Sequence, residues 1–178
     1  MSKRKLAAQP SDTTSLETTL VGDAAAAGQE TFTSVDATVD AGNLSNKSFV
    51  KGQITAVAVV EPIEGEQTFT DAFTDVSVTA ADTIKIKTKI VSASNGETSE
   101  TSFKATDHYG EDGDPKVTYK VKEKSVDEIP IDPDGNVAIA TFDAQATGEN
   151  TLVQVDAAAL AVEDELSLST VVVVTAIG

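Results

Sequence analysis

Residues 83–93 read T-I-K-I-K-T-K-I-V-S-A, and this stretch decides the fold class. On an extended chain its two faces would carry Ile84, Ile86 and Ile90 on one side and Lys85, Lys87 and Lys89 on the other. Successive side chains of a strand point to opposite faces, so a period of two predicts one buried and one solvated face. β-Branched residues at the apolar positions suit the pleated surface of a sheet. We therefore expect a protein built from strands.

Similar segments recur along the chain between turn residues. The pair N-G at 95–96 predicts a hairpin turn because both residues tolerate positive φ, and D-P-D-G at 132–135 is also a turn by composition. About eight strands are expected from residue 49 onward, over residues 49–60, 68–79, 83–93, 98–106, 116–124, 137–142, 151–155 and 166–177. Short strands at this spacing predict an all-β fold, either a β-sandwich or a jelly roll.

Residues 1–48 differ from the rest and predict an extended N-terminal arm. Lys3, Arg4 and Lys5 form a basic run without acidic neighbours. Leu16 and Leu20 have the i, i+4 spacing of a short helix over 11–21, and the alternation over 31–39 indicates an additional strand or an extended segment. The stretch A-G-N-L-S-N-K-S at 41–48 is typical of a linker. We expect an arm over 1–48 and a body over 49–178 that folds without it.

Composition excludes several kinds of site. The chain of 178 residues has no cysteine, so a disulfide framework, a Cys-based zinc site and a thiol nucleophile are excluded. Aromatic residues make up only 4%, with no Trp, which counts against a stacking platform for sugars or bases. The net charge of −16 favours solubility and repels nucleic acid. We expect no nucleic-acid partner and a core of Val, Ile, Leu and Ala.

Membrane and export signals are missing from the sequence. No apolar run approaches the roughly 20 residues that a membrane helix needs. The start, M-S-K-R-K-L-A-A-Q-P, is charged but has no apolar stretch of signal-peptide length behind it. We expect no membrane partner and a protein that is made and retained in a cytoplasm.

An enzyme is not expected. His108 is the only histidine, in the loop-like sequence D-H-Y-G-E-D-G-D-P, and no G-x-S-x-G motif accompanies it. Paired carboxylates could serve a glycosidase, but such a cleft usually has aromatic walls, and rings are scarce here.

Two acidic loops are candidate calcium sites, because clustered carboxylates supply the oxygen ligands that Ca²⁺ prefers. The candidate ligands are Glu111, Asp112 and Asp114 in one loop and Asp132, Asp134 and Asn136 in the other. The second loop has D-x-D-x-N spacing, but its glycine comes too early for an EF-hand and no Glu follows at the twelfth position. Plain turns are the alternative interpretation, with no cofactor bound.

Lysines gather in two of the predicted strands. Seven of the 12 lie in residues 83–93 and 116–124, and within each strand most project from one face. If the two strands share a sheet, a basic stripe forms on an acidic protein. The stripe would be either a docking face for an acidic partner or a solvated face whose lysines discourage edge-to-edge aggregation. The candidate partner-binding residues are Lys85, Lys87, Lys89, Lys120 and Lys122, together with Lys3, Arg4 and Lys5.

Three features together give the chain a family resemblance: the basic and then Thr/Ala-rich start, the run of strands from Phe49, and the apolar end T-V-V-V-V-T-A-I-G at 170–178. In this layout it resembles the small β-sandwich or jelly-roll cement (decoration) proteins of tailed-phage capsids. The resemblance implies a structural virion protein, assembled in the host cytoplasm. It also implies a trimer or other symmetric homo-oligomer that sits on joints between capsid proteins and stabilises the shell.

Other function classes stay open. A tail-tube or other virion subunit also uses β-sheets and arms, but stacks into rings. A calcium-dependent carbohydrate or adhesion module would instead hold a cation at one of the two acidic loops.

Overall fold

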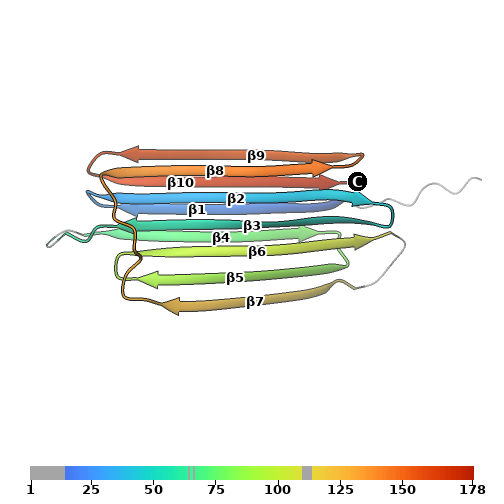
Figure 1. Ribbon diagram of the computed structural model, residues 1–178, viewed down its shortest axis with the longest axis horizontal. Coiled ribbons are helices and arrows are strands. Elements are labelled where there is room, and N and C mark those ends of the chain that lie inside the picture. Colours follow the sequence, from blue (N-terminus) through green and yellow to red (C-terminus); the bar gives the residue numbers. More distant parts are fainter. Residues whose placement is uncertain (1–14, 64, 66, 110–113) are drawn as a thin grey trace, which may run out of the picture.

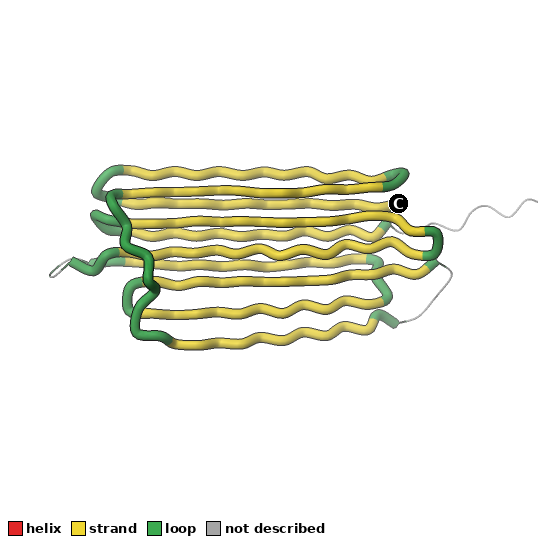
Figure 2. Tube along the Cα trace, viewed as in Figure 1, coloured by secondary structure: helices red, strands yellow, loops and turns green. Residues whose placement is uncertain are grey.

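The computed structural model describes residues 15–63, 65, 67–109 and 114–178. In these residues the chain forms ten strands and no helix (Figure 1). The strands make two sheets that pack face to face, and the loops lie at the two ends of the strands (Figure 2). The expected all-β class is confirmed, as a β-sandwich. None of the described segments offers a helix that could cross a membrane.

The smaller sheet has four antiparallel strands. In spatial order they are β4 (Phe69–Thr79), β1 (Leu16–Ala27), β10 (Leu166–Ile177) and β9 (Thr151–Val162). The first and last strands of the chain are therefore neighbours in the middle of this sheet, where Leu16 lies opposite Ile177.

The larger sheet has six strands. In spatial order they are β7 (Lys116–Ser125), β5 (Thr83–Ala93), β6 (Gly96–His108), β3 (Lys47–Val60), β2 (Thr31–Leu44) and β8 (Asn136–Thr147). The pairs β5–β7 and β2–β8 are parallel and the others antiparallel. The predicted hairpin between β5 and β6 is confirmed, but its turn lies at 94–95, because Gly96 already begins β6 opposite Ala93. Neither Asn95 nor Gly96 adopts the positive φ on which the N-G prediction rested.

Alternating side chains from both sheets fill the interior. Leu20, Ile54 and Val173 are completely buried there, and many of the other buried side chains are alanines or hydroxyl residues. Gly22 lies at the centre of β1 because a Cβ there would come 2.7 Å from both Ile54 Cδ1 and Val35 Cγ1. The two sheets thus approach closely, and small residues make this approach sterically acceptable.

The N-terminal region does not form the separate arm expected over 1–48. The strand expected over 31–39 is confirmed as part of β2, but the chain from Leu16 onward forms β1 instead of continuing a helix over 11–21. The expected linker at 41–48 is the end of β2, a two-residue turn at 45–46 and the start of β3. The sandwich therefore includes residues well before 49, and residues 1–14 lie outside the described part.

The two sheets differ in width, and the excess lies on one side. β9 packs over β8, β10 over β2, β1 over β3, and β4 over β6. β5 lies at the edge of β4, which covers it only in part, and β7 extends beyond β4 with no strand of the four-stranded sheet above it (Figure 1). We call the inner surface of β5 and β7 the ledge.

Candidate functional site

The outer face of the six-stranded sheet carries a dense group of lysines, which we call the lysine face. Strand register places them on the same side of four neighbouring strands, because alternate residues share a face. The lysine face consists of nine exposed residues: Lys51 on β3, Lys104 on β6, Lys85, Lys87 and Lys89 on β5, and Lys116, Lys120, Lys122 and Lys124 on β7.

Like charges lie directly opposite each other within this face. The cross-strand pairs are Lys87 with Lys120, Lys89 with Lys122, Lys85 with Lys104, and Lys104 with Lys51. Within the described part of the chain, only one of these lysines forms an ion pair: Lys51 Nζ lies 2.9 Å from Asp40 Oδ2. Glu100, the acid among them, accepts a hydrogen bond of 3.1 Å from Gln53 Nε2. The face therefore has a large unneutralised positive charge.

The structure brings together the five predicted strand lysines Lys85, Lys87, Lys89, Lys120 and Lys122. The sequence interpretation missed Lys51 and Lys104 as members of the face. Lys104 is the single lysine of β6, and Lys51 shares β3 with Lys47 alone, so only the pairing of β3 with β6 and of β6 with β5 adds them to the group. Lys3, Arg4 and Lys5 lie outside the described residues.

The opposite outer face of the molecule has the opposite charge. On the four-stranded sheet, register places five acids on the outer side: Glu17, Asp23, Asp71, Asp75 and Asp156. The four strands of this sheet contain no lysine or arginine. The sandwich is therefore polarised, with a basic face on one side and an acidic face on the other.

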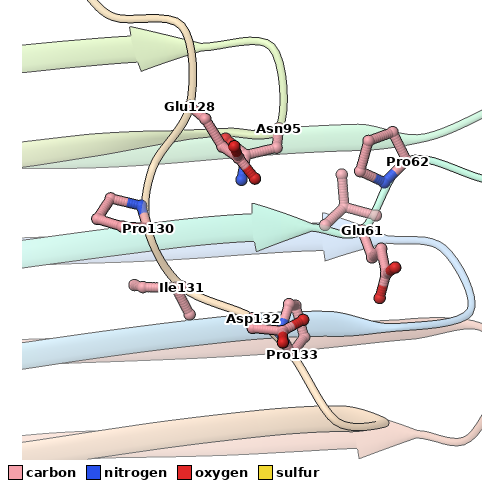
Figure 3. Close-up of a pocket in the computed structure, with 9 residues that line it drawn as sticks. Glu61, Pro62, Asn95, Glu128, Pro130, Ile131, Asp132 and Pro133 are labelled. Atoms are coloured by element: carbon pink, nitrogen blue, oxygen red, sulfur yellow. The ribbon is translucent and has the colours of Figure 1, made fainter.

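A depression of about 530 Å³ lies at one end of the sandwich, between the end of β3 and the segment before β8 (Figure 3). Asn95 fixes this segment, because its Nδ2 donates to Ile129 O at 2.9 Å and its Oδ1 accepts from Ile129 N at 2.8 Å. The charged groups lining the depression are Glu61, Glu128 and Asp132. A depression with only acidic charges fits no anionic ligand.

Carboxylates also accumulate beside this depression. The pKa of Glu30 lies above its ordinary value, mainly because of a hydrogen bond to the Glu61 side chain and the charge of Glu61, and then because of Asp134 and Asp132. Two carboxyl groups that share a proton explain this direction, because the neutral form of one is favoured beside the charge of the other.

The structure describes the two calcium candidates to different extents. Asp132 lines the depression, whereas Asn136 begins β8 and donates from Nδ2 to Gly28 O at 3.2 Å. Among the described residues, no group of three or more His, Cys, Asp or Glu side chains is arranged to hold a metal ion. Glu111 and Asp112 lie outside the described residues and leave Asp114 as the described member of its loop. Calcium at either loop stays a prediction.

His108 ends β6 beside an aspartate. Its backbone N–H donates to Asp82 Oδ2 at 2.6 Å, and its Nδ1 lies 3.4 Å from the same oxygen. Burial raises the pKa of the adjacent Asp107, the charge of Asp82 adds to this rise, and His108 opposes it. Among the described residues, the side-chain partner of this imidazole is therefore the carboxylate of Asp82.

Comparison with known proteins gives no relative. No family model, no curated protein and no solved structure matches this chain.

Proposed function

We propose that this protein is a structural component of a virion, a cement protein that binds an assembled capsid through its lysine face and stabilises the shell. The single observation that supports this most is the concentration of nine lysines on one face of a chain whose net charge is −16. The partner surface would be acidic, since complementary charge accelerates docking and selects the partner.

The arrangement of the lysines argues for a role beyond solubility. Like charges directly opposite each other in a sheet are destabilising, by a few tenths of a kcal/mol or more per pair. Lys87 and Lys120 form such a pair, as do Lys89 and Lys122. Alternating acids and lysines would keep the face equally soluble without this repulsion. A bound acidic surface would remove the repulsion, so the face is better suited to the bound state than to the free protein.

Stabilisation of a shell requires only contact. A protein that binds the assembled form and not its separated subunits shifts the equilibrium toward assembly by mass action. A broad sheet face can span several subunits at once. Lys3, Arg4 and Lys5 would add a second basic contact from the first 14 residues.

Gradient fractionation tests the proposal. In lysates of cells that naturally make the protein, we expect it to sediment with shell-sized particles at low salt. About 1 M NaCl should release it, because the Debye length then falls to about 3 Å. Recovery of all the chain in the soluble fractions at low salt would contradict the proposal.

Rebinding to salt-stripped particles tests the face itself. The double variant Lys87→Glu, Lys89→Glu should lose rebinding. The matched control, Glu17→Lys with Asp156→Lys on the opposite face, should retain it. Equal rebinding by both variants would exclude the lysine face as the docking surface.

A further inference from the structure

The ledge exposes large side chains on the side of the six-stranded sheet that elsewhere faces the core. Val117, Tyr119 and Val121 of β7 point to this inner side, because register aligns them with the inward-facing residues of β5. Their exposed fractions are 60%, 62% and 44%. Ile84, by contrast, lies opposite Val117 on β5 and is 9% exposed. The interior surface thus continues past the edge of the covering sheet.

Two unpaired strand edges lie on the same side as the ledge. β4 ends the four-stranded sheet and β7 ends the six-stranded sheet. The two strands run in opposite directions (Figure 1). A strand placed beside β4 would both continue the smaller sheet and cover the ledge, and an antiparallel partner suits the open edge.

We propose that two copies of this chain pair about a two-fold axis parallel to the strands, so that each ledge covers the other and β7 of each copy extends β4 of its partner. On each side of this dimer a four-stranded sheet would join a six-stranded one to form a single ten-stranded sheet. The excess width of one sheet matches the missing width of the other, which is the self-complementarity that a two-fold interface requires.

Hydrogen bonds within one copy predict the register between copies. Thr74 Oγ1 on β4 lies 2.8 Å from Thr101 Oγ1, which lies 2.9 Å from Thr88 Oγ1. Thr88 in turn lies opposite Val121 on β7. Thr74 and Val121 are therefore at the same height along the strands. Rotation about an axis parallel to the strands keeps heights unchanged, so Thr74 would lie opposite Val121 of the partner subunit.

This register brings complementary surfaces together on both faces. On the inner side, Val76 would lie opposite the partner's Tyr119 and Val78 opposite the partner's Val117. On the outer side, Asp75 would lie opposite the partner's Lys120. The acidic face of one copy would thereby meet the lysine face of the other along each new ladder, with opposite charges across it.

The contact is compact and has a defined end. Two strands of about ten residues give a footprint of about 30 by 10 Å, to which each new ladder adds two strand edges, so this interface belongs among the smaller specific ones. The Glu97 carboxylate accepts a hydrogen bond from the Ala72 backbone. The added ladder would therefore run over residues 73–79 of β4.

Engineered cysteines test both the pairing and its register, since the chain has no cysteine of its own. Within one copy, residues 75 and 120 face opposite sides of the sandwich and cannot be bridged. Between copies their Cα atoms would be about 5 Å apart, within disulfide range. Asp75→Cys with Lys120→Cys should form a covalent dimer on mild oxidation. The control, Asp75→Cys with Lys124→Cys, displaces one cysteine by about 13 Å along the strand and should not.

Mass in solution completes the test. Light scattering of the native protein at tens of micromolar should give twice the 18.4 kDa chain mass. Tyr119→Lys should give a monomer with an unchanged circular dichroism spectrum. A native monomer, the trimer that the family resemblance implies, or equal cross-linking by the two cysteine pairs would each overturn the two-fold pairing.

Discussion

Hydroxyl groups occupy much of the space between the sheets, and one network spans both. Thr74 on β4 bonds to Ser99 and Thr101 on β6, and Thr101 bonds to Thr88 on β5. Thr33 and Ser169 form a second such link, 2.9 Å long, between β2 and β10. Because these groups are buried, each hydrogen bond avoids the cost of an unsatisfied hydroxyl.

Thr101→Val should show that cost. The substitution leaves Thr74 with its bond to Ser99 but removes the Thr88 partner. We expect the free energy of unfolding to fall by about 1–3 kcal/mol, measured by urea denaturation. Thr101→Ser, which keeps the hydroxyl and loses one methyl, should cost only about 1 kcal/mol. If the valine variant were as stable as the native chain, the network would have no energetic role.

Glu97 makes stability depend on pH. Burial raises its pKa, a hydrogen bond from the Ala72 backbone opposes the rise, Asp71 adds to it, and Ser92 opposes it. With a raised native pKa, the folded chain binds more protons than the unfolded chain, so the contribution of this group falls as pH rises above about 4.5. Glu97→Gln should therefore melt above the native protein at pH 7, and the difference should disappear below pH 4. A difference that is constant with pH would contradict this.

At the scale of elements, the alternation of apolar and polar residues predicted which segments form strands, but it did not predict which strands pair with each other. The isoleucine and lysine pattern placed β5 and its two faces correctly, and the N-G pair at 95–96 predicted the hairpin with β6, although the turn itself lies at 94–95. Leu16 and Leu20 indicated a helix because a spacing of four also fits 3.6 residues per turn. Four is even as well, so on a strand both leucines share a face with Thr18, and all three are buried.

The lysine face likewise shows that residue spacing within one strand predicts which face a side chain lies on, but not which strands lie side by side. Lysine spacing within β5 and within β7 predicted two basic stripes. Their union, and the addition of Lys51 and Lys104, depends on which strands pair, and this is decided by contacts between distant segments. The ledge was equally unpredictable, because it results from the different widths of the two sheets.

Lys87→Glu should separate stability from binding on this element. Lys87 lies opposite Lys120 and Ser102, so reversal replaces a repulsive pair with an attractive one. We expect a gain of about 0.5 kcal/mol in the free energy of unfolding at low salt, which should shrink in 1 M NaCl. Lys87→Gln should give about half the gain. A loss of stability on reversal would mean that the repulsion is already relieved in the free protein.

At the scale of the whole molecule, the chain closes on itself. β1 pairs with β10 along its full length and with β4 on the other side, so the first described strand is central to its sheet. Most contacts therefore join residues far apart in sequence, and such topologies fold slowly because loop closure precedes the stabilising contacts.

Truncation tests this closure. Removal of residues 1–48 takes away β1 and β2, which contribute Leu16, Leu20 and Val35 to the core. β3 and β10 would each lose a paired neighbour, and burial worth about 2 kcal/mol per large apolar side chain would be lost. We expect this variant to lose its cooperative thermal transition, whereas removal of residues 1–14 should leave the melting temperature within a few degrees. Because the shorter deletion keeps every described strand, its rebinding to stripped particles isolates the contribution of Lys3, Arg4 and Lys5. A cooperative transition in the longer deletion would show that the eight remaining strands can form a closed sandwich alone. It would then support the sequence prediction of a separate arm over 1–48.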